Sequence, residues 1–172
     1  MSLAHDLVWA VRADRFGSRA RAVCDRHDLD ERCRRRAREG ATPPEPELDR
    51  RGRTLVRRVW TFDTAPVGLT LCGPAYRDTP VLYATRTVRR LTGYDLSELR
   101  GENPRLFQGP ETEPGAVADL RAAVEAWNET TVELTNHRRD GTPVRVRVTL
   151  APLAGDDGTV THWLGVQRRV ER

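Results

Sequence analysis

The sequence predicts an α+β fold in which a mostly antiparallel, five-stranded sheet carries helices grouped on one face. Three observations predict this fold. Two short apolar segments come first, a region with apolar residues three and four positions apart follows, and three strand-like segments joined by turns come last. Because Asp-Gly is a strong hairpin signal, the last three strands are expected to be antiparallel neighbours. The first 40 residues lie outside this pattern and are predicted to form a helical extension.

The N-terminal extension, residues 1–40, is predicted to contain two helices, separated by a break at Gly17-Ser18. The first helix covers residues 3–11, and the second runs from Ser18 towards Arg38. The apolar stripe of the second helix is thin, so this helix must pack on the core domain, on a second copy or on another protein. Residues 41–54 begin with several prolines and are predicted to form a stiff linker. The two apolar stripes consist of Leu3, Leu7 and Val11, and of Ala20, Val23, Cys24 and His27.

The core domain is predicted to span residues 55–172. Its long helix carries an apolar stripe at helical spacing, and its last strands are joined by turns at Asp140-Gly141 and at Asp157-Gly158. The stripe consists of Val117, Leu120, Val124 and Trp127. The expected elements are strands at 67–72 and 80–84, helices at 85–91, from 95 or 97, and at 114–127, and strands at 130–138, 144–152 and 159–168.

Composition and charge narrow the classes of function. Charged residues make up 31% of the chain, and no apolar run approaches the roughly 18 residues of a membrane span. No signal peptide is recognised, so a cytoplasmic protein is expected. The three cysteines show neither metal-ligand spacing nor a disulfide framework. Residues 1–60 hold 15 Arg against 10 acidic residues, but the two signs are interleaved and lack aromatic partners, so nucleic-acid binding is not expected.

Residues 101–112 carry the segment Gly-Glu-Asn-Pro-Arg-Leu-Phe-Gln-Gly-Pro-Glu-Thr. With Asn136, Asp140-Gly141 and the segment Leu164-Gly-Val-Gln167, it forms a pattern that continues without a gap from about Leu69. This pattern resembles the light–oxygen–voltage (LOV) subfamily of PAS domains, whose motif is G-x-N-C-R-F-L-Q-G-P-E-T. The resemblance implies a PAS fold and noncovalent binding of flavin mononucleotide (FMN), with FAD less favoured. It also implies a blue-light or redox sensor rather than an enzyme.

The resemblance implies a set of flavin-binding residues. Arg105 and Arg121 resemble the phosphate ligands, which suits the planar donor fork of arginine. Asn136 and Gln167 resemble the residues that bind the ring edge, where amides can match both donors and acceptors, and Gln108 resembles a residue near the ribityl chain. The full set expected at the flavin is Asn103, Arg105, Gln108, Arg121, Asn136, Gln167, Cys72, Pro104, Phe107, Leu150 and Trp163.

Two residues depart from the family pattern. Pro104 stands where LOV domains have the cysteine that adds to the excited flavin, so the usual adduct cannot form at this position. Proline suits the first position of a helix, and Asn103 before it is a favoured cap. Val146 stands where the family has a second asparagine at the ring edge, and its presence predicts weaker or looser flavin binding.

Without the usual cysteine, light is expected to act by reduction of the flavin to the neutral semiquinone. Trp163 is the electron donor nearest by register. Gln167 is expected to rotate its amide when a nitrogen of the flavin ring becomes protonated. Cys72 falls on a pocket-facing position, where it is a substitute nucleophile or electron donor or, as we favour, a small buried apolar residue. The expected outputs are the N-terminal helices or a homodimer interface, with a downstream partner that the sequence does not identify.

Three alternatives stay open at the level of sequence. The chain could be a cofactor-free PAS module that only dimerises, which a colourless purified protein would indicate. A nucleic-acid binder would need a compact helix-turn-helix, and residues 11–38 have too few apolar residues for one. An enzyme is disfavoured because the four histidines have no matched acidic or cysteine partners in a recognisable arrangement.

Overall fold

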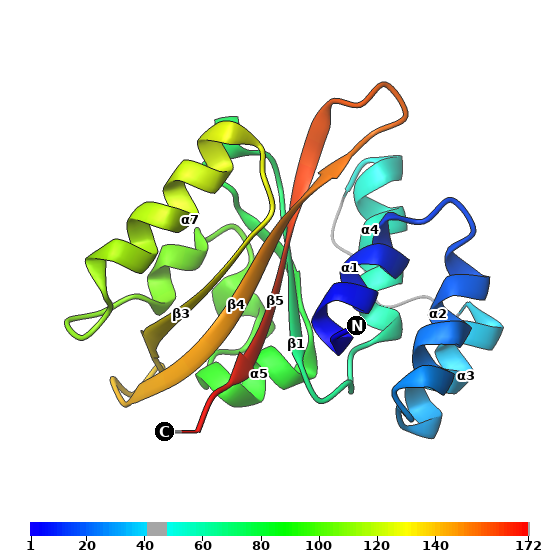
Figure 1. The fold of residues 1–172 in the computed structure, drawn as a ribbon, viewed down its shortest axis with the longest axis horizontal. Coiled ribbons are helices and arrows are strands. Elements are labelled where there is room, and N and C mark those ends of the chain that lie inside the picture. Colours follow the sequence, from blue (N-terminus) through cyan, green and yellow to red (C-terminus); the bar gives the residue numbers. More distant parts are fainter. Residues whose placement is uncertain (41–47, 172) are drawn as a thin grey trace.

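The computed structural model describes residues 1–40 and 48–171. Its centre is a five-stranded antiparallel sheet with the strand order β2-β1-β5-β4-β3, which confirms the predicted PAS-type α+β fold (Figure 1). The strands are β1 (Gly68–Cys72), β2 (Val81–Ala84), β3 (Thr130–His137), β4 (Pro143–Ala154) and β5 (Val160–Arg169). The α-helices are α1 (Leu3–Arg12), α2 (Phe16–Arg26), α3 (Glu31–Glu39), α4 (Arg50–Thr61), α5 (Arg86–Thr92), α6 (Leu96–Leu99) and α7 (Pro114–Ala126), with short 3-10 turns at Ala75–Arg77 and Pro104–Phe107.

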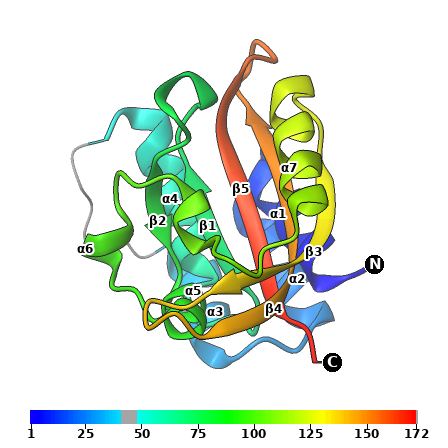
Figure 2. The same cartoon turned by 90° about the vertical axis from the view of Figure 1, so that its left-hand side faces the viewer.

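Helices cover both faces of the sheet. Helices α5, α6 and α7 lie on one side, seen from the front in Figure 2, and the N-terminal helices α1–α4 lie on the other. Strand β1 shows the consequence, because all five of its residues are buried. Successive side chains of a strand point to opposite faces, so Leu69 and Leu71 face the N-terminal helices, whereas Thr70 and Cys72 face the opposite side. Helices α5, α6 and α7 are therefore grouped on one face, and α1–α4 cover the other.

The N-terminal helices pack on the core domain of their own chain, which decides between the three occupants left open by the sequence. Helix α1 contacts β4 and β5, and α4 contacts β1 and β2. Apolar side chains from both sides form one continuous cluster, which removes the thin helical stripes from water. The cluster includes Leu7, Val11, Ala20, Val23, Val56 and Val59 from the helices and Leu69, Leu71, Ala151, Leu153, Leu164 and Val166 from the sheet.

The predicted helix from Ser18 towards Arg38 is wrong in its extent. Gly17 and Ser18 lie inside α2, since the first break comes earlier, between Arg12 and Phe16, and a second break follows Arg26. Asp28 has a left-handed backbone with φ of 48°, and Asp30 caps α3 by accepting a hydrogen bond from the Cys33 amide at 2.9 Å. Such a cap satisfies an amide at a new helix start, so the sequence Asp-Leu-Asp favours two helices over one.

Helix α4 was not predicted, and the end of α7 differs from the prediction. Helix α4 begins at Arg50, inside the segment 41–54 predicted to be a linker, because Asp49 caps it through the Gly52 amide at 2.7 Å. Residues 41–47 of that segment lie outside the described residues. Helix α7 ends at Ala126, and Trp127 adopts a left-handed backbone. The apolar stripe therefore stops at Val124, and Trp127 is 61% exposed.

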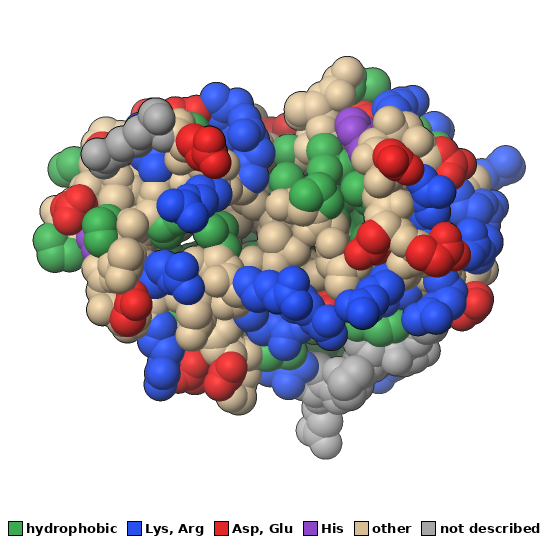
Figure 3. Space-filling model, turned by 90° about the horizontal axis from the view of Figure 1, so that it is seen from below, with side chains coloured by type: hydrophobic (Ala, Val, Ile, Leu, Met, Phe, Trp, Pro, Cys, Tyr) green, Lys and Arg blue, Asp and Glu red, His purple; other side chains and the backbone are tan. Residues whose placement is uncertain are grey.

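Charged side chains of both signs are interleaved on the face that Figure 3 shows from below. Within the N-terminal helices, Arg34 pairs with Asp28 at 2.6 Å and Arg38 pairs with Glu31 at 2.5 Å. One acidic residue is buried: Asp6 of α1 accepts hydrogen bonds from His27 Nε2 at 2.7 Å and from Arg26 Nη1 at 3.0 Å. Burial opposes ionisation of Asp6, but these hydrogen bonds outweigh it and hold its pKa below the usual value. Among the described residues, no helix is long and apolar enough to cross a bilayer.

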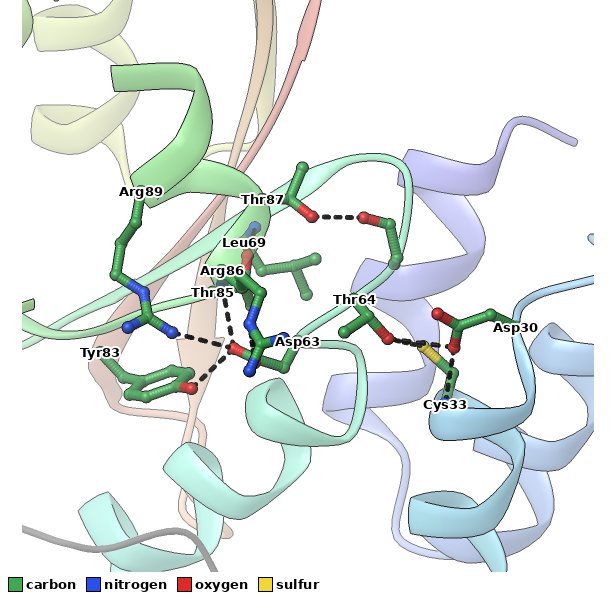
Figure 4. A network of polar contacts seen from close by, with 11 residues as sticks. Asp30, Cys33, Asp63, Thr64, Leu69, Tyr83, Thr85, Arg86, Thr87 and Arg89 are labelled. Atoms are coloured by element: carbon green, nitrogen blue, oxygen red, sulfur yellow. Dashed lines mark hydrogen bonds and ion pairs between the residues drawn. The ribbon is translucent and has the colours of Figure 1, made fainter. Parts of the chain in front are cut away.

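A polar network around Asp63 joins the two layers of helices (Figure 4). Asp63 follows α4 and is buried, and its Oδ1 accepts hydrogen bonds from the Tyr83 hydroxyl at 2.7 Å and from the Arg86 amide at 2.9 Å. Arg89 Nη2 lies 3.7 Å from the same oxygen. Asp63 therefore fixes the start of α5 against the end of α4.

Tyr83→Phe is expected to destabilise the protein by about 1.5 kcal/mol, because it removes a buried hydrogen bond to a carboxylate without creating a cavity. Chemical unfolding of the purified variant measures this loss. The control is Tyr76→Phe, since Tyr76 is 82% exposed and should show no change. Equal stability of both variants would mean that the Tyr83 hydroxyl contributes nothing to the network.

Candidate functional site

A cavity of about 350 Å³ lies between the sheet and the layer that contains α7. This volume falls within the range of small-molecule pockets. Every residue of the predicted flavin-binding set lines it: Asn103, Arg105, Gln108, Arg121, Asn136, Gln167, Cys72, Pro104, Phe107, Leu150 and Trp163. The structure adds Thr70, Ala75, Asp78, Thr79, Val117, Leu120, Val124, Leu134, Val148 and Gly165 to the lining.

The antiparallel register builds the floor of the cavity. Cys72 lies opposite Trp163, and Leu150 lies opposite Gly165. Gly165 has no side chain, which leaves space over the middle of the sheet between the larger neighbours. Gln167 is opposite Val148 on β4 and Gly68 on β1, so its amide lies over the central strand of the sheet.

Two amide side chains in the cavity are buried, since Asn136 and Gln167 are each 5% exposed. No hydrogen bond joins either side chain to another described residue. Their polar atoms are not among the fully buried, unpartnered atoms of the described residues, so they face the open cavity and can reach a ligand. A planar ligand whose edge offers donors and acceptors would satisfy both, and the pyrimidine edge of a flavin has this character.

The opening of the cavity carries two arginines, Arg105 and Arg121. No ion pair or hydrogen bond joins Arg121 to another residue in the described part of the chain. Arg105, in contrast, donates to both carboxylate oxygens of Asp78, at 3.0 and 2.5 Å. These hydrogen bonds lower the pKa of Asp78, so its carboxylate is charged at neutral pH. The cationic end and the amides therefore fit the phosphate and the ring of FMN.

Pro104 begins the 3-10 turn Pro104–Phe107, as predicted. The Asn103 side chain caps this turn by accepting a hydrogen bond from the Arg105 amide at 2.8 Å. Its Nδ2 also donates to the Asp78 carbonyl at 2.7 Å and to Thr79 Oγ1 at 2.8 Å. The turn Pro104–Phe107 is thus fully formed with proline, a residue without a nucleophile, at its first position.

Cys72 is the cysteine that lines the cavity. Its side chain is buried, and burial alone raises the pKa of the thiol to about 12. The thiol is therefore protonated at neutral pH, unlike the thiolate of a typical reactive cysteine. Trp163, directly opposite on β5, is 1% exposed and also faces the cavity.

Val146 does not line the cavity. It is fully buried in an apolar cluster with Leu134 and Val144, so its side chain serves packing. The apolar stripe of α7 also contributes to the cavity. Val117 and Val124 line the same cavity as Arg121, because α7 forms its wall rather than packing flat on the sheet.

Three polar residues at the cavity escaped the sequence analysis: Thr70, Asp78 and Thr79. The alternation along β1 could have placed Thr70 on the face of Cys72. Asp78 and Thr79 reach the site through bonds to residues more than 20 positions later, and no local pattern marks them.

The comparisons agree with this geometry. A family model described as PAS domain matches residues 66–169. A blue-light-activated histidine kinase of Rhizobium johnstonii is 39% identical over 100 residues, 55% of this chain and 29% of the relative. The bacterioopsin transcriptional activator of Halobacterium salinarum is 36% identical over 109 residues, 63% of this chain and 16% of the relative. The chain thus spans less than a third of the length of either protein.

Solved structures give the same result. A light–oxygen–voltage domain studied with a flavin analogue has 40% identity and a TM-score of 0.62, covering 64% of this chain and 82% of that domain. The LOV domain of the blue-light photoreceptor Aureochrome1 has 35% identity and a TM-score of 0.60, covering 64% and 87%. The LOV domain of a blue-light-activated histidine kinase from Erythrobacter litoralis has 31% identity and a TM-score of 0.59, covering 62% and 98%. The chain therefore belongs to the PAS domain family and, within it, to the LOV domains.

Proposed function

We propose that this chain binds FMN and acts as a light or redox sensor that forms no cysteinyl adduct at position 104. The observation that carries the proposal is the pair of buried amides, Asn136 and Gln167, in a cavity that also bears two arginines. The ring edge would take the amides, and the phosphate would take Arg105 and Arg121. Proline at position 104 leaves the fold of this region intact while removing the thiol.

The bound flavin supplies one-electron photochemistry, which needs a donor and a proton. Trp163 lines the cavity and is shielded from solvent, so it is the proposed electron donor. Its oxidised indole is re-reduced by an external thiol, and the proton comes from water at the cavity opening. By this route a bound flavin would take up one electron and one proton. A newly protonated ring nitrogen changes from acceptor to donor, and Gln167 can present its oxygen instead of its nitrogen by rotating.

The proposed signal leaves the cavity through β5. Gln167 faces the cavity, whereas its neighbour Val166 belongs to the apolar cluster under the N-terminal helices. A shift in the hydrogen bonds of β5 would therefore act directly on the packing of α1 and α4. The proposed outputs are a looser N-terminal layer or a homodimer that forms on the uncovered sheet. A downstream partner protein would bind one of these two states.

An absorption spectrum of the purified protein, before and after blue light, tests the function. A yellow protein that develops a broad long-wavelength band under light with a thiol reductant is the expected result. Bleaching to a form that absorbs only in the near ultraviolet would instead identify Cys72 as a substitute nucleophile. A colourless protein that takes up no added FMN would overturn flavin binding.

Gln167→Leu is expected to retain flavin and its photoreduction but to abolish the structural response. Hydrogen exchange of residues 1–40, compared in the dark and after photoreduction, measures that response. Wild-type protein should lose protection in this segment by about tenfold, and the variant should show no change. Gln108→Leu is the matched control, since Gln108 also lines the cavity but lies outside the sheet. A full response in Gln167→Leu would remove this residue from the signal.

The second candidate is a cofactor-free PAS module that associates with itself. Val146 favours it, because an apolar contact stands where a ring-binding amide would otherwise be. In that case the purified protein would be colourless, would not bind FMN and would form a dimer whose dissociation constant is the same in the dark and in the light.

A further inference from the structure

The opening of the cavity is bordered by a polar cluster of Asp78, Thr79, Asn103 and Arg105, all of which line the cavity. Arg105 donates from Nη1 and Nη2 to the two oxygens of Asp78, so both ends of this ion pair are bidentate. The Asp78 and Arg105 side chains are 63% and 62% exposed, which places the pair at the entrance rather than in the interior.

The position of Asp78 is set by the backbone. Asp78 and Thr79 have φ angles of 64° and 44°, in the left-handed region that few residues other than glycine adopt. Asn103 Nδ2 holds this conformation through the Asp78 carbonyl and the Thr79 hydroxyl. Asn103 Nδ2 also donates to Asp78 Oδ1 at 3.2 Å, so both the backbone and the carboxylate of Asp78 are held in place, in contrast to a solitary surface ion pair between two mobile side chains.

The charge at this end of the cavity is lower than its arginines suggest. Arg105 and Arg121 contribute two positive charges, and Asp78 removes one of them. A flavin phosphate carries about −1.5 to −2 at neutral pH, so it meets one net positive charge instead of two. The phosphate must also share Arg105 with the carboxylate, and the two anions repel each other at close range.

We propose that Asp78 is a specificity-determining residue of the flavin site, which lowers the preference of the cavity for FMN over unphosphorylated riboflavin by competing for Arg105. The inference rests on the proposed flavin binding. It concerns only the phosphate end, because riboflavin and FMN share the ring that Asn136 and Gln167 would bind.

The test compares the dissociation constants of riboflavin and FMN for flavin-free full-length protein, measured by fluorescence titration at low salt. Asp78→Asn should raise the FMN preference by about tenfold, the order expected for one unit charge at this range near a surface. Asparagine tolerates the left-handed backbone as well as aspartate does, so this variant keeps the local fold. Arg105→Gln should reduce the preference instead, and added salt should shrink the difference between Asp78→Asn and wild type.

Asp119→Asn is the matched control, because Asp119 is exposed on the same helix as Arg121 but does not line the cavity. It should leave the preference unchanged. If circular dichroism shows that Asp78→Asn is unfolded, Asp78→Gly gives the same charge change at a position that suits glycine. An unaltered preference in the folded variant, with both flavins bound, overturns the role of Asp78 alone. Failure of wild-type protein to bind either flavin overturns the flavin function, and this inference with it.

Discussion

Pro104→Cys is expected to restore a light-driven bond between a thiol and the flavin. Residue 104 lines the cavity at the first position of its 3-10 turn, where an amide has no partner within the turn. The cap that fixes this turn comes from Asn103 and reaches the Arg105 amide, so it does not depend on proline. The thiol should therefore occupy the place that the side chain of Pro104 holds now, at a stability cost of less than about 1 kcal/mol.

The measurement for Pro104→Cys is the visible spectrum under blue light. The blue absorption of the flavin should bleach fully to a near-ultraviolet form and recover in the dark, whereas wild-type protein should not produce this form. Pro104→Ser is the matched control, since it makes the same backbone change without a thiol. Both variants belong in a Cys72→Ala background, so that bleaching can come only from position 104. Unchanged photochemistry of flavin-loaded Pro104→Cys would show that residue 104 does not face the reactive part of the ring.

Gly68→Ala is expected to be the most destabilising small substitution in the sheet. A Cβ atom at residue 68 would lie 2.5 Å from Val88 Cγ2 and 3.1 Å from the Val88 backbone nitrogen. Val88 is fully buried on α5, so neither its side chain nor its backbone can move without displacing the helix from β1. Overpacking of this kind costs about 3 kcal/mol, which lowers the melting temperature of a chain of this size by roughly 6 to 12 °C.

Thermal unfolding monitored by circular dichroism measures the effect of Gly68→Ala. Gly115→Ala is the control, because a Cβ at that helical position meets nothing within 4 Å and should leave stability equal or slightly higher. The double variant Gly68→Ala with Val88→Ala should not regain full stability, since the contact with the Val88 backbone remains. A melting temperature within about 1 °C of wild type for Gly68→Ala would contradict the close packing of α5 on β1.

Most of the core domain could be predicted because its signals are local. The apolar spacing in α7 and the Asp-Gly turns around β4 depend on neighbours in the chain, and the observed bounds of α7, β3, β4 and β5 differ from the predicted ones by two residues or fewer. All the predicted site residues line the cavity, because the resemblance to LOV domains assigned them through a match without gaps.

Most features that the sequence did not predict depend on contacts between residues far apart in the chain. The face on which α1 packs depends on an apolar surface built from β1, β4 and β5, which are separate in the chain. Asp78 is bound to Arg105, 27 positions later, and a lone aspartate after a proline carries no sign of that contact. The split between α2 and α3 was missed for a different reason, because the helical spacing continues through Asp28 and only the caps interrupt it.

Strand β5 has a consequence for how far any signal must travel. Its residues alternate between two compartments, with Trp163, Gly165 and Gln167 toward the cavity and Leu164 and Val166 toward the N-terminal helices. The cavity face of β5 and its face under the N-terminal helices are thus separated by one peptide unit. Under the proposed function, a slight twist of this strand would change the cavity and the packing of the N-terminal helices at the same time.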